Sequence, residues 1–95
     1  MSKLRKCFRI QGRVQGVSFR ANTQEQAVAL QLSGWVRNCS DGSVETAAEG
    51  TPQAMAEFEK WLQKGPRWAE VKMIQELERS EVETGQLPLP FEIRY

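Results

Sequence analysis

Two hydrophobic periodicities alternate along this chain, and their order restricts the fold more than any other feature. Residues 4–11 alternate between apolar side chains such as Phe8 and Ile10 and polar or charged ones, which is typical of a half-buried strand. Residues 19–32 are rich in Ala, Gln and Leu and place Ala27 on one apolar helical face. Strand and helix patterns then recur, so we expect a mixed fold.

The remaining elements follow from the same periodicities together with turn and capping residues. An Asp-Gly pair supplies the geometry of a hairpin turn, and a Thr-Pro pair caps and begins a helix. The expected elements are a helix over 19–32 ended by Ser33 and Gly34, hairpin arms over 35–39 and 43–49, a helix from Thr51 and Pro52 to Gly65 and Pro66 with Met55, Phe58 and Leu62 on one face, a strand over 68–77 with Val71, Met73 and Gln75 on one face, a loop over 85–90 and a short strand within 91–95.

The order strand, helix, strand, strand, helix, strand is that of the split βαβ topology. It predicts an α+β, ferredoxin-like (βαββαβ) fold, with an antiparallel sheet, two helices packed on one face and a short C-terminal strand. A chain of 95 residues suits one compact domain, so we expect residues 1–95 to form a single domain. Because this topology carries many unrelated activities, function has to be argued from a site.

The composition excludes several classes of function. The chain has no histidine, which removes the commonest general base, the commonest metal ligand and the usual partner of a serine or cysteine nucleophile. Its net charge of +1 comes from interspersed signs, so we expect no nucleic-acid partner. The first residues lack the apolar run of a signal peptide or membrane span, which predicts a cytoplasmic protein without a membrane partner.

Cys7 and Cys39 are the only cysteines, and we expect both to be free thiols. Two cysteines are too few for a disulfide framework, and their spacing matches no zinc-binding pattern. In the predicted sheet they lie two strands apart, which separates their backbones by about 10 Å. A disulfide requires Cα atoms within about 7 Å.

The stretch GRVQGVSFR, residues 12–20, joins the first strand to the first helix and offers only backbone amides and arginine for chemistry. Its two glycines allow the backbone to curl so that amide hydrogens converge, and the start of the following helix also favours an anion. Arg20 adds a forked guanidinium that can bind two phosphate oxygens. The alternative is an ordinary strand-to-helix turn with a surface arginine, and the residues alone are compatible with both.

Asn38 is the second candidate, because on the predicted hairpin it shares the core-directed face of Val36. A side-chain amide carries both donors and an acceptor, so it can hold a water molecule beside an anion in the glycine loop. The alternative is a strand-end asparagine that bonds its own hairpin turn. The pattern is compatible with either role.

The segments IQGRVQGVSFR and GWVRNCSDGSVETAAEG resemble the two signature segments of the acylphosphatase family, small ferredoxin-like enzymes that hydrolyse the carboxyl-phosphate bond. The resemblance covers essentially the whole chain, including the terminal FEIRY. By position it implies a phosphate-binding loop of Arg13, Val14, Gln15, Gly16 and Val17, phosphoryl binding by Arg20, and orientation of the attacking water by Asn38. Cys39 stands where relatives have a threonine that supports the asparagine, and Ser18 is assigned no role.

The resemblance also implies a reaction and its partners. An acyl phosphate is already activated, so the enzyme has to position water and stabilise charge on the phosphoryl oxygens. We therefore expect no metal, no other cofactor and no covalent intermediate, and we hypothesise that a substrate phosphate oxygen accepts the proton of the water. The expected ligands are small acyl phosphates, with inorganic phosphate or sulfate as competing anions, and the expected state is a monomer.

Two other functions are compatible with this fold. RNA-recognition domains stack bases on aromatic residues of their central strands, but that aromatic-rich strand motif is absent from this sequence. Acylphosphatase-like modules also occur as accessory domains inside larger maturation enzymes, whereas we expect this chain to be an independent domain.

Overall fold

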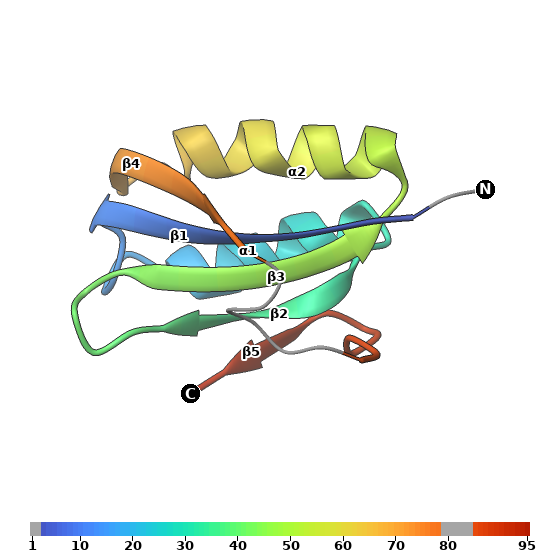
Figure 1. Ribbon diagram of the computed structural model, residues 1–95. Coiled ribbons are helices and arrows are strands. Elements are labelled where there is room, and N and C mark those ends of the chain that lie inside the picture. Colours follow the sequence, from blue (N-terminus) through green and yellow to red (C-terminus); the bar gives the residue numbers. More distant parts are fainter. Residues whose placement is uncertain (1–2, 79–84) are drawn as a thin grey trace.

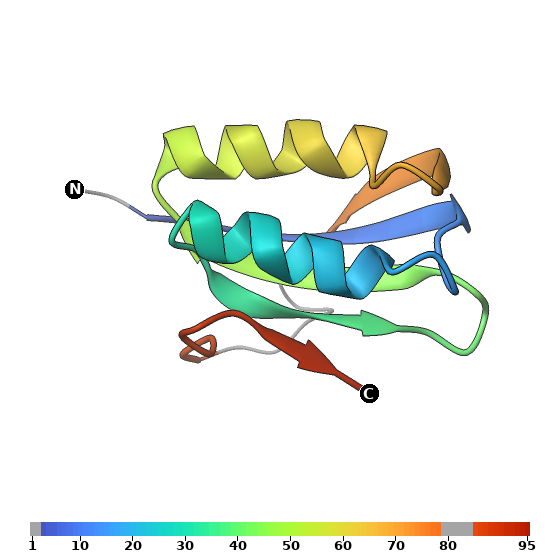
Figure 2. The same cartoon turned by 180° about the vertical axis from the view of Figure 1, so that it is seen from behind.

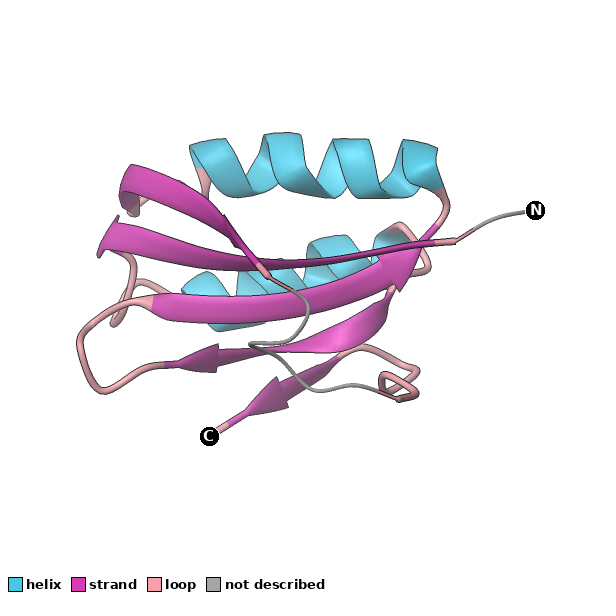
Figure 3. Cartoon of the chain, viewed as in Figure 1, coloured by secondary structure: helices cyan, strands magenta, loops and turns pink. Residues whose placement is uncertain are grey.

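The computed structural model describes residues 3–78 and 85–95 and has the expected order of elements. They are β1 (Leu4–Arg13), α1 (Phe19–Ala29), β2 (Ser33–Asn38), β3 (Val44–Gly50), α2 (Pro52–Lys64), β4 (Glu70–Leu77) and β5 (Glu92–Arg94). Figure 3 shows α1 behind the strands and α2 above them. The alternation of periodicities therefore predicted the type and order of the elements correctly.

The strands form one five-stranded sheet in the order β4-β1-β3-β2-β5. The pairs among β1 to β4 are antiparallel, and β5 joins the edge of β2 in parallel. Both helices cover the same face of the sheet (Figure 1, and from behind in Figure 2). This confirms the ferredoxin-like α+β fold and adds a parallel edge strand to it.

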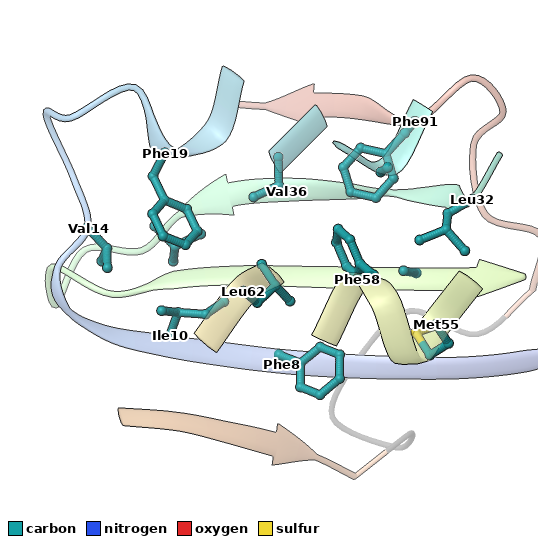
Figure 4. Close-up of a cluster of buried hydrophobic side chains, with 13 residues drawn as sticks. Phe8, Ile10, Val14, Phe19, Leu32, Val36, Met55, Phe58, Leu62 and Phe91 are labelled. Atoms are coloured by element: carbon teal, nitrogen blue, oxygen red, sulfur yellow. The ribbon is translucent and has the colours of Figure 1, made fainter. Parts of the chain in front are cut away.

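The hydrophobic core lies between the helices and the sheet (Figure 4). Met55, Phe58 and Leu62 of α2 are buried, as their spacing predicted, in the same cluster as Phe8 and Ile10 of β1. Burial of each such side chain contributes about 1.5–3 kcal/mol, so this cluster fixes α2 on the sheet. Within residues 3–78 and 85–95, no helix is long and apolar enough to cross a membrane.

Helix α1 ends earlier than predicted. Its last residue is Ala29, Gln31 takes a left-handed conformation with φ of 60°, and the amide of Leu32 donates to the carbonyl of Ala27 at 2.9 Å. This is the Schellman arrangement, in which the left-handed residue is usually glycine. Because this position holds a glutamine, the sequence did not indicate that the helix ends here. Residues 33–34, where the end of the helix was expected, are instead the start of β2.

The predicted face of β4 was wrong at two positions. Val71 and Ile74 pack against the core, whereas Met73 and Gln75, expected on the same face as Val71, are exposed. The register between β1 and β4 shifts just after Val71, so an extra residue on β4 reverses the alternation. The strand also begins at Glu70 rather than at residue 68.

The cysteines are free thiols, as predicted. Cys7 is buried, and Cys39, which follows β2, is half-buried. Cys7 belongs to a second, smaller apolar cluster, which also contains Trp35, Ala47, Leu77 and Leu87. Because Cys7 alternates with core residues along β1, this cluster lies on the face of the sheet that the helices leave open.

Several segments meet at one end of the sheet (Figure 1). The end of β1 with the glycine loop, the start of α1, the β2–β3 hairpin and the end of β5 all lie there. The parallel pairing matches Arg37 of β2 with Arg94 of β5, which brings the C-terminal residue beside Asn38. This end of the sheet therefore holds every candidate site residue.

Candidate active site

A cavity of about 370 Å³ opens at this end of the sheet. Its lining consists of Val14, Gly16, Ser18, Phe19, Arg20, Ala21, Asn38, Ile93 and Tyr95. It thus brings together four sequence-predicted residues, Val14, Gly16, Arg20 and Asn38. The other three do not line it: Arg13 and Val17 line a neighbouring cavity, and Gln15 turns its side chain toward the hairpin.

The glycine loop has the backbone shape that anion sites use. Gly16 has a φ of 77° and Ser18 a φ of 60°, so two residues of this short loop are left-handed. Left-handed residues within such a turn can aim successive amides into one concavity. Ser18 is also the N-cap of α1, and its side chain makes no capping hydrogen bond. The first amides of α1 therefore have no side-chain acceptor at the cap and can serve a ligand.

Arg20 is oriented by the end of the chain. Its Nη1 donates a hydrogen bond to the carbonyl of Arg94 at 3.2 Å, and its guanidinium lies 4.7 Å from the centroid of the Tyr95 ring. A guanidinium has five N–H donors, so this bond leaves others for the cavity. Cation–π contact with Tyr95 restrains the side chain without neutralising its charge.

Asn38 is the last residue of β2 and is half-buried. Its side chain forms no hydrogen bond with any residue in the described part of the chain, although it lines the cavity. The hairpin turn is closed without it: Asp41 Oδ1 accepts hydrogen bonds from the Ser43 amide at 2.9 Å and the Ser43 hydroxyl at 2.6 Å. The side-chain amide of Asn38 is therefore available to a ligand or a water molecule.

The carboxylate of Asp41 in the same turn is stabilised by hydrogen bonds from Ser43. The hydrogen bond from the Ser43 hydroxyl, followed by that from the Ser43 amide, lowers the pKa of Asp41 below its ordinary value. Asp41 thus accepts both bonds in its ionised form at neutral pH. This favours one turn geometry at the hairpin that carries Asn38.

Gln15 connects the glycine loop to this hairpin. Its Nε2 donates to the carbonyl of Cys39 at 2.8 Å and to the carbonyl of Ser43 at 2.9 Å. Both carbonyls belong to the closed hairpin turn, in which the Cys39 amide also donates to the Ser43 carbonyl at 2.8 Å. Gln15 therefore holds the loop and Asn38 in a defined relation.

A charged cluster on the open face of the sheet joins the strands near the site. Glu45 of β3 accepts from Arg9 of β1 at 2.6 Å and from Arg37 of β2 at 2.7 Å, and its side chain is only 8% exposed. Burial by itself raises the pKa of Glu45, but the hydrogen bonds from Arg37 and Arg9 outweigh it and hold the pKa below its ordinary value. Glu45 is thus ionised, and its hydrogen bonds join β3 to β1 and to β2.

Sequence reasoning missed some residues of the cavity. Ser18 was assigned no role, and Ile93 and Tyr95 were placed only in a short terminal strand. The available signal for Ile93 was its alternation in FEIRY. The position of Tyr95 depends on the parallel pairing of β5 with β2, which no local pattern indicates.

The fold and the cavity define a small α+β protein with polar donors gathered at one end of its sheet. Comparison with known proteins is specific: the acylphosphatase family model matches residues 6–92. An acylphosphatase of Synechococcus sp. (strain CC9902) is 48% identical over 90 aligned positions, and the match covers 90% of this chain and 70% of that relative.

Solved structures agree with this assignment. The crystal structure of acylphosphatase from Bacillus subtilis is 34% identical with a TM-score of 0.83, covering 99% of this chain and 100% of that one. The acylphosphatase from Coxiella burnetii is 33% identical with a TM-score of 0.85, covering 97% of this chain and 93% of that one. The chain belongs to the acylphosphatase family, enzymes that hydrolyse acyl phosphates, and the predicted family and enzyme class are confirmed.

Proposed function

We propose that this chain hydrolyses the carboxyl-phosphate bond of small acyl phosphates in the cavity between Gly16, Arg20 and Asn38. The observation that carries the proposal is that Arg20 from α1 and Asn38 from β2 line one cavity beside the left-handed loop. A guanidinium, a side-chain amide without a hydrogen bond to the described residues, and the backbone amides of the loop are groups that can bind a phosphoryl group and an attacking water.

In this proposal the loop amides and Arg20 bind the phosphoryl oxygens. Arg20 is held by the Arg94 carbonyl and the Tyr95 ring, so its remaining donors are already oriented before substrate arrives. Preorganised donors stabilise charge that develops in the transition state without a reorganisation cost. Of the predicted loop residues, Val14 and Gly16 line the cavity, while Gln15 supports the loop from outside it.

The proposed chemical step is a displacement at phosphorus. The oxygen of the water held by Asn38 bonds to phosphorus, the bond from phosphorus to the bridging acyl oxygen breaks, and its electron pair leaves on the carboxylate. One proton of the water passes to a phosphoryl oxygen, so the products are a carboxylate and dihydrogen phosphate. The side chains lining the cavity include no carboxylate, thiol or imidazole, which supports a proton acceptor on the substrate itself.

The experiment is hydrolysis of acetyl phosphate in water enriched in oxygen-18, followed by mass spectrometry of both products. The expected result is phosphate release well above the enzyme-free rate, with the label in inorganic phosphate. Label in acetate would mean attack at the carbonyl carbon and would contradict the proposed step. Arg20→Ala serves as the control for contaminating phosphatases, since it removes the proposed site and keeps the same purification.

An RNA-recognition role receives no support from the described strands. Phe8 is the aromatic residue of the central strands β1 and β3, and it is buried in the core. On the open face, Trp35 is 2% exposed and lies beneath the guanidinium groups of Arg37 and Arg94. Stacking of bases requires exposed aromatic faces.

The remaining sequence-based expectations stay predictions within this proposal. They are a monomeric state, a single domain over residues 1–95, a cytoplasmic location and competition by inorganic phosphate or sulfate. The last of these follows from the same donors, because a site of amides and a guanidinium binds a tetrahedral oxyanion whether or not it carries an acyl group.

A further inference from the structure

A second cavity, of about 580 Å³, lies against the first and shares Gly16 and Ser18 with it. Its other walls include Arg13 and Val17 from the glycine loop and Arg67 and Trp68 from the segment between α2 and β4. The proposed phosphoryl site does not use this space. Its volume is within the range of small-molecule sites.

The chemistry of this cavity is aromatic and cationic. Trp68 is 67% exposed, and the guanidinium of Arg67 lies 5.1 Å from the centroid of its ring. No carboxylate is among the residues that line the cavity within the described chain. Arg13 and Arg67 form no ion pair with any described residue, although Glu70 is the register partner of Arg13. An exposed indole beside two unpaired guanidiniums favours a flat or extended group that carries negative charge.

The ridge between the two cavities is open. A Cβ atom built on Gly16, which both cavities share, would meet no atom within 4 Å, so the space on that side of the glycine is open. An acyl phosphate bound through its phosphoryl group beside Gly16 can direct its acyl group past this glycine, because both cavities share it. Passage over Gly16 leads that group to Trp68 and Arg67.

We propose that the second cavity is the acyl subsite of this enzyme and that it favours acyl phosphates whose acyl part bears a carboxylate. Trp68 packs on the body of the acyl group, and Arg67 pairs with its distal carboxylate. Arg13 adds a second positive charge at the entrance. This inference rests on the proposed function, because it assumes that the phosphoryl group binds beside Arg20.

The test compares benzoyl phosphate with 4-carboxybenzoyl phosphate, two rigid substrates that differ by one distal carboxylate. For each protein the ratio of kcat/KM for the carboxylated substrate to kcat/KM for the plain one is measured. Arg67→Gln should lower this ratio by about two- to fivefold, which is the size of one solvent-exposed ion pair. Hydrolysis of benzoyl phosphate itself should change little.

Two further variants separate a subsite from a general charge effect. Lys64→Gln removes a positive charge near the end of α2 that does not line this cavity, so the ratio should stay unchanged. Trp68→Ala should raise KM for both aromatic substrates and leave KM for acetyl phosphate unchanged, because the acetyl group is too short to reach the indole.

The outcomes distinguish this proposal from the one on which it rests. If both aromatic substrates are hydrolysed but Arg67→Gln does not change the ratio of their kcat/KM values, the acyl subsite is contradicted and the proposed function is not. The same holds if Lys64→Gln changes this ratio as much as Arg67→Gln does. An equal loss of activity on both aromatic substrates in Arg67→Gln would place the phosphoryl group near Arg67, and this result would also contradict the acyl subsite. Absence of hydrolysis of every acyl phosphate contradicts the proposed function and the subsite together.

Discussion

The side-chain amide of Gln15 donates a hydrogen bond to the main-chain carbonyl of Cys39 at 2.8 Å, so the glycine loop is tied to the residue that follows Asn38. The same amide group also reaches the carbonyl of Ser43 on the other side of the turn at 2.9 Å. The distance between the phosphoryl site and the proposed water site thus depends on one side chain that does not line the cavity.

Replacement of this side chain is expected to loosen the site. Gln15→Ala removes two hydrogen bonds, each of which contributes about 1 kcal/mol net to the free energy of unfolding. We expect kcat/KM for benzoyl phosphate to fall by about 10- to 100-fold, since a displacement of about 1 Å can cost that much. In Gln15→Glu the value of kcat/KM should fall at least as far, because a carboxylate would face the carbonyl oxygens of Cys39 and Ser43.

Gln63→Ala, an exposed glutamine on α2, is the matched control and should behave like the wild type. Steady-state kinetics and chemical denaturation on the same preparations check both effects. Unchanged kinetics in Gln15→Ala, with or without a loss of stability, would mean that the tie is structural only.

Arg20→Ala is expected to abolish nearly all turnover while the fold persists. Loss of one preorganised donor costs about 10² to 10³ in rate, and a charged donor should reach the upper end of that range. Arg20→Lys should restore little, because an ammonium group cannot form the two-pronged contact. The measurement is kcat with the unfolding midpoint alongside, and Lys60→Ala, an exposed cation of α2, is the control. Near-normal hydrolysis by Arg20→Ala would show that the site lies elsewhere.

Inorganic phosphate and sulfate are expected to inhibit competitively, and chelators are expected to have no effect. The residues that line the cavity offer amides, a guanidinium and a carboxamide, which recognise the oxyanion directly. Inhibition constants in wild type and Arg20→Ala check the first statement, because the variant should bind phosphate more weakly. Activity that disappears with a chelator and returns with a divalent cation would contradict the second.

Glu45→Gln is expected to lower stability in a pH-dependent way. The pKa of Glu45 is held below its ordinary value of 4.5, so its contribution is present above that value and is lost as the pH falls through the lower folded pKa. The variant should lose about 1 kcal/mol at pH 7, because Arg9 and Arg37 are partly exposed to water. The difference from the wild type should shrink below pH 4.5. Denaturation curves at several pH values would contradict this if the difference grew on acidification.

Local sequence signals predicted the order of the elements and part of the cavity lining, namely Val14, Gly16, Arg20 and Asn38. Glycine spacing identified the loop, and strand alternation put Asn38 on the face of Val36. The bonds of Gln15 were not predictable in this way, because they span 24 and 28 residues and depend on how the hairpin folds beside the loop. The contact between Arg20 and Tyr95 likewise depends on the parallel edge strand.

Two local errors have similar physical origins. The end of α1 was missed because Gln31 adopts a left-handed conformation that is usually assigned to glycine. The face of Met73 was wrong because a register shift between β1 and β4 inserts one residue. In both cases the backbone has a geometry that the residue type does not indicate.

In the proposed function Arg20 binds the phosphoryl group and Asn38 positions the water, and Asn38→Ala separates these two roles. The measurement is kcat of the folded variant for benzoyl phosphate, set beside its inhibition constant for inorganic phosphate and its unfolding midpoint. We expect kcat to fall by about 10² or more, while phosphate affinity and stability change little. Arg20→Ala, in contrast, should weaken both kcat and phosphate affinity. A destabilised Asn38→Ala protein with normal kcat would contradict the account, because Asn38 would then support the hairpin rather than the attacking water.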